Sequence, residues 1–311
     1  MSLHLLPRPL RYVLAVAEHG SVQAASRATG IAASAIDRHI HALEDASDTP
    51  LFERLPRGMR PTAAGEAVIV MARRWLADAE RLEDGLQEMR GQEHGTVRLA
   101  AMDSLANGVL PELVAWVQAE HPRIRLAVDI VTPADAARAL DDGTADAVLA
   151  FNLPQQRYQH RIWTADLPFG VVVAPGHPLA ARDLVTLTAL ADFPTASQSA
   201  LLPVRQYLDA RFGWLFSQNA PVLVTNSLQL LKQAVGQGDL AILTSELDVL
   251  PELETGQLVF LPLVESGLRP QTISVAIDTR RPLTRVTRVV SERAAEVMAA
   301  RLADVRAGGR A

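Results

Sequence analysis

Residues 11–44, RYVLAVAEHGSVQAASRATGIAASAIDRHIHALE, have the clearest structural pattern in the chain. Its first part has apolar residues at helical spacing and ends at Gly20, a residue favoured just after a helix. Ser21 suits the N-cap of a second short helix that ends at Gly30. A third helix follows a tight turn. Two short helices joined by a Gly-containing turn are typical of a helix-turn-helix.

The third helix, SAIDRHIHALEDA over residues 34–46, has two distinct faces. Its apolar side chains gather on one side of a helical wheel at about 100° per residue. Ser34, Asp37, Arg38 and His41 lie on the opposite side. Such a face fits the major groove of DNA, where Arg pairs with guanine and Ser or His reaches bases or phosphates. The alternative is a polar face that is merely solvated.

A basic hairpin is predicted directly after these helices. The segment PLFERLPRGMRPT, residues 50–62, contains two short strand-like runs around a Pro-Arg-Gly turn. Arg54, Arg57 and Arg60 surround the tip. A basic hairpin after a helix-turn-helix acts as a wing that contacts phosphates or the minor groove. For Arg54, an ion pair with Glu53 or Asp48 is the alternative role.

Together these segments closely resemble the N-terminal domain of LysR-type transcriptional regulators, over about sixty residues in one register. The matching elements are Ala24-Ala25, Ser34-Ala35-Ile36, Arg38, Leu43-Glu44, Phe52-Glu53-Arg54, Arg57-Gly58, Thr62 and Gly65. The chain departs from the family at Ala32 and Ala33, where Ser and Gln are common, and at Asp37, where Ser is common. Asp37 then either accepts from a cytosine amino group or pairs with a neighbouring Arg. The residues expected to face double-stranded DNA are Ser34, Ala35, Asp37, Arg38, His41, Arg54, Arg57 and Arg60.

A long helix is predicted from Thr62, its N-cap, to about Arg90. It has a near-heptad apolar stripe: Val68, Met71, Trp75, Ala79, Leu82, Leu86 and Met89. This stripe needs a cover, either the rest of the same chain or a second subunit. The resemblance implies the second, a linker helix that pairs antiparallel in a homodimer or homotetramer and presents two DNA readers to an interrupted palindromic operator.

Residues 91–311 alternate strand-like and helix-like segments, after a plausible hinge at residues 91–95. This alternation favours parallel sheet covered by helices. The resemblance implies two Rossmann-like lobes of the kind found in type 2 periplasmic binding proteins. The predicted domains are residues 1–62 (winged helix-turn-helix), 63–90 (linker helix) and 91–311 (effector domain). Within the last, lobe I comprises 91–162 and 268–311 and lobe II comprises 163–267, so that the chain crosses near Ile162 and returns near Leu268.

Polar residues follow several predicted strands, at the edge where such sheets bind ligands. They are Asp103 and Ser104, Phe151 and Asn152, Ser197 and Ser199, and Thr225, Asn226 and Ser227. The resemblance implies that they line an effector cleft between the lobes. Helix capping is the alternative for Ser104, Ser199 and Asn226. Asp103 is expected either to be an N-cap or first-turn acid of the first sensor helix, or to select an effector that carries an amino group or hydroxyls over a dicarboxylate.

Composition and missing motifs remove other classes of protein. The 311 residues have a formal net charge of −5 and contain no cysteine, which excludes disulfides and thiolate metal sites. No apolar run of membrane-spanning length and no signal peptide is evident, so a cytoplasmic protein is expected. His39 and His41 point to different faces of a helix, so no metal site is predicted. GxSxG, Walker, HExxH and dinucleotide motifs are absent, which argues against an enzyme.

The sequence therefore predicts a DNA-binding transcriptional regulator of LysR type that is controlled by a small-molecule effector and has no cofactor. RNA polymerase is a further candidate partner, and no membrane partner is expected. A solute-binding protein without DNA-dependent regulation is the alternative. The sensor lobes alone would fit that class, but it has no use for the winged helix-turn-helix.

Overall fold

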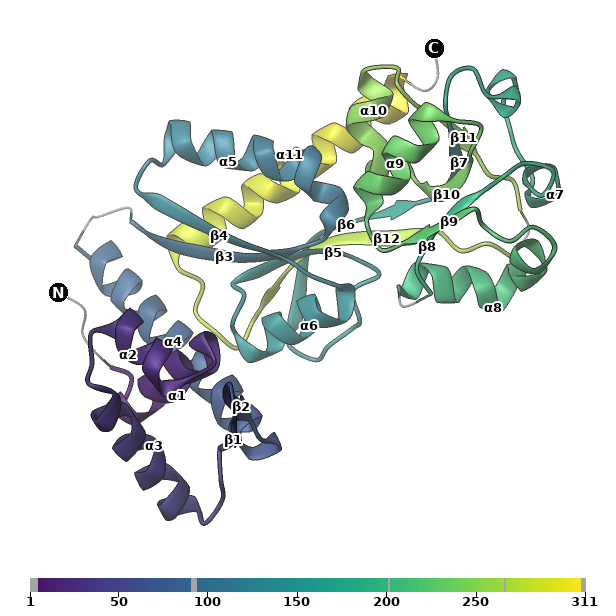
Figure 1. Cartoon of the computed structure of the whole chain (residues 1–311). Coiled ribbons are helices and arrows are strands. Elements are labelled where there is room, and N and C mark those ends of the chain that lie inside the picture. Colours follow the sequence, from purple (N-terminus) through teal and green to yellow (C-terminus); the bar gives the residue numbers. More distant parts are fainter. Residues whose placement is uncertain (1–4, 91–93, 201, 266, 309–311) are drawn as a thin grey trace. The chain divides into compact units, whose positions relative to one another are not determined.

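The computed structural model describes residues 5–90, 94–200, 202–265 and 267–308. The chain forms two compact units (Figure 1). One comprises residues 1–95 with 141–144, and the other comprises residues 96–140 with 145–311. The predicted hinge over residues 91–95 lies largely outside the described residues. No helix in the described ranges is long and apolar enough to cross a bilayer.

The N-terminal unit begins with the predicted helix-turn-helix. Its helices are α1 (Arg8–His19), α2 (Val22–Thr29) and α3 (Ala33–Ser47). Gly20 and Gly30 both have φ of 70°, the left-handed conformation that ends a helix. The Ser21 side chain accepts a hydrogen bond from the Ala24 amide, as expected of an N-cap. Val13, Val16, Ala25, Ile36 and Ile40 bury the apolar faces of the three helices against one another.

The wing is a hairpin of β1 (Phe52–Leu55) and β2 (Gly58–Pro61), paired antiparallel. A carboxylate of α3 fixes where it starts, because Glu44 Oε1 accepts hydrogen bonds from the amides of Leu51 (2.8 Å) and Phe52 (3.2 Å). At the hairpin tip the Met59 amide donates to the Gly20 carbonyl oxygen at 2.7 Å. The wing is therefore anchored to both α1 and α3.

The long helix α4 runs over Ala63–Glu88 and begins at the predicted cap. The Thr62 hydroxyl accepts from the Gly65 amide at 3.0 Å and donates to the Pro50 carbonyl oxygen at 2.7 Å. Ile69 and Ala72 face the helix-turn-helix core. Five large apolar side chains of the predicted stripe are exposed: Met71 (40%), Trp75 (46%), Leu82 (53%), Leu86 (37%) and Met89 (85%).

The C-terminal unit contains a five-stranded sheet with helices on both faces. Its strand order is β4 (Ile124–Ile130), β3 (Gly95–Ala101), β5 (Ala147–Phe151), β12 (Gln271–Asp278) and β6 (Gln159–Leu167). Side chains of β5 alternate between two cores. Leu149 packs with α5 (Val109–Glu120) and α11 (Arg285–Gly308), whereas Val148 packs with α6 (Pro133–Asp142) on the other face. Figure 1 shows α5 and α11 together on one side and α6 on the other.

A second sheet forms the other lobe of the same unit. Its strands are β10 (Ile242–Ser245), β7 (Phe169–Val173) and β11 (Val259–Pro262), in that order. A parallel pair, β8 (Ala196–Gln198) with β9 (Leu223–Thr225), continues the sheet through a bridge between Thr195 and Ala241. The helices of this lobe are α7 (Leu187–Leu190), α8 (Pro203–Gln218), α9 (Leu228–Gln237) and α10 (Leu250–Glu254).

The prediction of parallel sheets was partly wrong. β3 and β5 are parallel, but β12 pairs antiparallel with β5 and β6, and β7 pairs antiparallel with β10 and β11. The sheets are mixed because the chain leaves the first lobe through β6 and returns through β12 in the opposite direction. β6 also continues past Ile162, where the sequence predicted the crossing, to Leu167.

One prediction concerns Gly65 at the start of α4. A Cβ there would lie 1.9 Å from the Leu51 carbonyl oxygen, so Gly65→Ala forces apart the helix and the wing entry. We expect Gly65→Ala to lower the free energy of unfolding of the N-terminal unit by about 1–3 kcal/mol, the usual cost of overpacking. The measurement is urea unfolding followed by circular dichroism.

The matched control is Gly85→Ala in the same helix, where an added Cβ meets nothing within 4 Å. Because Ala has a higher helix propensity than Gly, the free energy of unfolding of this variant should rise by up to about 1 kcal/mol. Equal effects of the two substitutions would contradict the close approach at Gly65.

Candidate DNA-binding surface and effector cavity

The polar face of α3 and the wing border one open hollow of about 490 Å³. Ser34 and Asp37 line it from α3, Arg54 and Leu55 from β1, and Met59 from β2. The structure thus brings together the helix face and the wing that the sequence singled out. Ala35 is half-buried beside them, and Arg38, His41, Arg57 and Arg60 are exposed.

A network of charged side chains joins the wing to α3. Arg54 Nη2 donates to Asp37 Oδ1 at 2.7 Å and lies 2.8 Å from His41 Nε2. His41 Nδ1 is 3.2 Å from Glu44 Oε2, the same carboxylate that orders the wing entry. Of the two roles open to Asp37, the structure shows the Arg pair. Arg54 forms a structural ion pair, as its alternative role predicted, but its partner is Asp37 rather than Glu53 or Asp48.

The exposed arginines of this surface fall into two groups. Arg60 Nη2 donates to Glu53 Oε2 at 2.7 Å, an exposed pair of small energetic value. Arg38 and Arg57 make no ion pair or hydrogen bond with any residue that the structure describes. Their guanidinium groups are therefore the ones free to contact DNA without first breaking an internal bond.

A second cavity, of about 360 Å³, lies within the C-terminal unit between its two sheets. The first lobe contributes Met102, Asp103, Ser104, Ile130, Val131, Thr132 and Asp135, and the second contributes Gln198, Leu202, Asn226, Leu228 and Asp248. Of the predicted effector residues, Asp103, Ser104 and Asn226 therefore meet in one place. The sequence missed Thr132 and Asp135, although they follow β4 in the same strand-to-helix position that identified the others.

The remaining predicted effector residues do not line this cavity. Phe151 is packed in the core of the first lobe. Asn152 joins the end of β5 to the start of β12, because its side chain accepts from the Thr272 amide at 3.0 Å. It borders a different cavity of about 310 Å³ that also contains Arg269.

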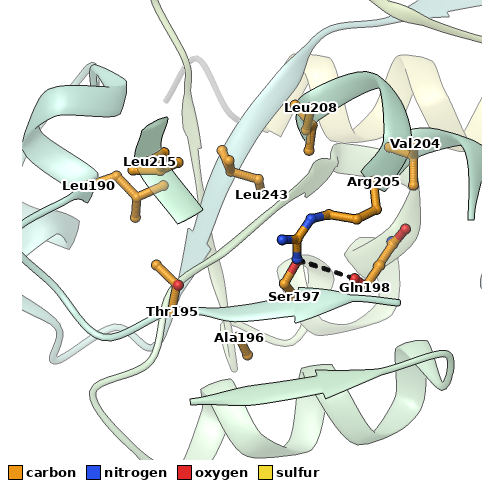
Figure 2. Close-up of a pocket in the computed structure, with 10 residues that line it drawn as sticks. All are labelled: Leu190, Thr195, Ala196, Ser197, Gln198, Val204, Arg205, Leu208, Leu215 and Leu243. Atoms are coloured by element: carbon orange, nitrogen blue, oxygen red, sulfur yellow. Dashed lines mark hydrogen bonds between the residues drawn. The ribbon is translucent and has the colours of Figure 1, made fainter. Parts of the chain in front are cut away.

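Ser197 faces the interior of the second lobe. Figure 2 shows it opposite Arg205, whose Nη1 donates to the Ser197 hydroxyl and, at 3.5 Å, to the Gln198 carbonyl oxygen. The space around this pair is about 10 Å³, enough for one water molecule rather than an effector. Gln198, one residue further along β8, is the one that reaches the cavity of about 360 Å³ between the two sheets.

The capping alternative applies to Ser227 rather than to its neighbours. The Ser227 hydroxyl accepts from the Leu230 amide and caps α9, and the Thr225 hydroxyl accepts from the Ser227 amide. The N-cap of α8 is Leu202, so Ser199 does not hold that position. Asp103 lies in the first turn of a five-residue 3-10 helix (η1, Asp103–Asn107), as the structural alternative expected, and Met102 holds the N-cap position.

Comparison with known proteins identifies the class of molecule. The family described as "Bacterial regulatory helix-turn-helix protein, lysR family" matches residues 7–66, and the family described as "LysR substrate binding domain" matches residues 90–299. The chain belongs to the LysR family. It is accordingly a DNA-binding transcriptional regulator with an effector-binding domain, and not an enzyme.

Individual relatives agree with this assignment. The RuBisCO operon transcriptional regulator of Allochromatium vinosum is 29% identical over 259 residues, 83% of this chain and 85% of the relative. The SDS degradation transcriptional activation protein of a Pseudomonas strain is 28% identical over 279 residues, 88% of this chain and 89% of the relative. A full-length cysteine-to-aspartate variant of OxyR from Pseudomonas aeruginosa shares the fold with a TM-score of 0.67 at 18% identity, covering 92% of this chain and 93% of that chain. CbnR in complex with its target DNA shares the fold with a TM-score of 0.64 at 18% identity, covering 94% of this chain and 99% of CbnR.

The two free arginines lead to a prediction that separates base contacts from phosphate contacts. Arg38 projects from the outward face of α3, so Arg38→Ala should weaken binding to the native operator by about 1–3 kcal/mol, the value of one good contact to a guanine. Binding to random DNA should change little. Fluorescence anisotropy with both kinds of duplex measures the two affinities.

Arg57→Ala is the matched comparison, because Arg57 is equally free but lies at the wing tip. This variant should lower the affinity for operator and random-sequence DNA alike. The slope of log affinity against log salt concentration should become shallower by about one unit, because one phosphate contact is lost. Unchanged operator affinity of a folded Arg38→Ala protein would contradict the assignment of Arg38. A purely sequence-specific loss in Arg57→Ala would contradict that of Arg57.

Proposed function

We propose that this LysR regulator changes its action on a target promoter when a small molecule binds the cavity between the two sheets of its C-terminal unit. The observation that carries the proposal is the lining of that cavity, to which both lobes contribute polar side chains. A ligand that contacts both lobes favours one arrangement of the lobes over another, and only such differential binding shifts a conformational equilibrium.

The proposed division of the chain follows its function. Residues 1–62 bind DNA, residues 63–90 form the helix that links the two domains, and residues 91–311 bind the effector. Because β6 extends to Leu167, we place the first lobe at 91–167 and 268–311 and the second lobe between them. A regulator that binds the chromosome must share its compartment, so we place the protein in the cytoplasm.

The exposed stripe of α4 supports assembly into a homodimer, or a homotetramer built from dimers. Met71, Trp75 and Leu82 are each at least 40% exposed, although they are large apolar side chains on one side of the helix. A second copy of α4, packed antiparallel, would cover them. Two copies of the DNA-binding surface then match an interrupted palindrome, whose half-site spacing reflects the two-fold symmetry of the protein. RNA polymerase remains a candidate partner at the promoter.

The test of this function is footprinting of the protein on the promoter region of its own gene and its neighbours. We expect protection of two symmetric half-sites, and a change in the protected region when the effector is added. Protection that shows no two-fold relation would count against a symmetric dimer on DNA.

A variant of α4 tests the dimer directly. Met71→Glu places a charge without a partner in the proposed apolar seam, so sedimentation velocity should show monomers. Arg73→Glu is the control, because Arg73 is exposed on the side of α4 away from the stripe, and this protein should stay dimeric. A dimeric Met71→Glu protein would show that other surfaces hold the subunits together.

A further inference from the structure

The lining of the effector cavity has a one-sided charge. Three carboxylates border it, those of Asp103, Asp135 and Asp248, whereas none of its lining residues is Arg, Lys or His. Among the residues that the structure describes, no three acidic or histidine side chains are placed to hold a metal ion.

Two of the three carboxylates already have partners. Asp248 is buried and accepts from the hydroxyls of Thr244 (2.5 Å) and Ser245 (2.7 Å) and from the Ser245 amide (3.1 Å). Asp135 accepts from the Thr132 hydroxyl at 2.7 Å and pairs with the exposed Arg138 at 3.2 Å. Asp103 is half-buried, and its carboxylate makes no hydrogen bond or ion pair within the described residues. It is the acid left to meet a ligand.

Three helix N-termini also reach the cavity, those of α6, α8 and α9, and they favour anions. Each is equivalent to roughly half a positive charge, about 1.5 in total. Their effect is already reduced, since Thr132 and Ser227 accept amide hydrogen bonds at two of them and Pro203 has no amide hydrogen to offer at the third. Asp103 and Asp248 oppose this effect, because neither carboxylate pairs with an arginine or lysine among the described residues. The balance of charge favours a cation.

A second, independent feature points to a ligand at this place. Ser104, next to Asp103, is only 8% exposed and lines the cavity. Its hydroxyl has no hydrogen-bond partner among the residues that the structure describes. A buried polar group without a partner costs about 1–3 kcal/mol, so this hydroxyl is expected to be satisfied by a bound molecule.

We propose that the effector is a small organic ammonium compound, an aliphatic amine, whose charged nitrogen binds Asp103 and whose polar hydrogens or heteroatoms reach the Ser104 hydroxyl. The apolar side chains of Met102, Ile130, Leu202 and Leu228 provide the wall for its carbon chain. The volume of about 360 Å³ is near the lower end of the range for small-molecule sites, roughly 300–1,000 Å³, so the compound is small. Dicarboxylates are expected to bind poorly, because a desolvated anion would face carboxylates and none of the lining residues is Arg, Lys or His. This inference rests on the proposed effector role of the cavity.

The test compares matched ligands on the full-length protein by isothermal titration calorimetry. Putrescine, succinate and the neutral diol 1,4-butanediol all have four carbon atoms and differ in the charge of their end groups. We expect putrescine to bind at micromolar to millimolar concentration, the diol to bind more weakly, and succinate to give no binding heat. Succinate binding at least as tight as putrescine binding, or no putrescine binding at millimolar concentration, overturns the proposal.

Variants locate the binding. Asp103→Asn keeps the size of the side chain and removes its charge, so putrescine affinity should fall by about tenfold or more, the value of a charge-assisted hydrogen bond. Asp183→Asn is the matched control, because Asp183 is an exposed acid near Val185, at the sheet edge opposite β8 and β9, and putrescine affinity should not change. Equal effects of the two variants overturn the role of Asp103.

Ser104→Ala separates ligand binding from structure. If the hydroxyl serves the ligand, this variant weakens putrescine binding several-fold and leaves the melting temperature of the free protein unchanged or higher, since no internal bond is lost. A lower melting temperature with unchanged affinity overturns the role of Ser104. A neutral or anionic effector that binds in a Ser104-dependent manner overturns the amine class alone and leaves the proposed regulator intact.

Discussion

The pairing of β6 with β12 is the constraint on which the sensor depends. Both passages of the chain between the lobes run through these two antiparallel strands, from the pair of Gln271 with Leu167 to that of Asp278 with Gln159. β7 then begins at Phe169, two residues after β6 ends, so little chain separates the two sheets. The candidate effector cavity forms where the strand ends of one lobe face those of the other. Its shape therefore follows from the geometry of this crossing as much as from the side chains that line it.

The helical parts of the fold could be predicted closely from the sequence. Gly20, Gly30, Ser21 and Thr62 mark helix ends through backbone conformation and local hydrogen bonds, which depend on residues only a few positions away. The sheets were harder, because strand direction depends on where the chain travels between strands. The alternation of strands and helices suggested parallel sheets, whereas the return through β12 and the insertion of β7 between β10 and β11 make them mixed.

The site residues show the same division between local and long-range information. Polar residues that follow strands pointed to one edge of the sheet, and Asp103, Ser104 and Asn226 do line one cavity there. The position of a residue after a strand does not predict the direction in which its side chain points. Ser197 points to Arg205 inside its lobe, and Asn152 bonds to the backbone of β12. Likewise, the partner of Arg54 lies 17 residues earlier in the chain, on a face that only the packing of the wing against α3 brings near.

The contact between Arg54 and Asp37 has an evolutionary consequence. One residue belongs to the helix face expected to read bases and the other to the wing, so neither can be replaced alone without altering the surroundings of the other. Loss of Asp37 would release a cation on the wing, and loss of Arg54 would leave a bare carboxylate toward DNA. Residues in such direct contact typically show non-additive effects when both are substituted. Changes at these two positions are therefore expected to be coupled in evolution, so that a substitution at one favours a compensating substitution at the other.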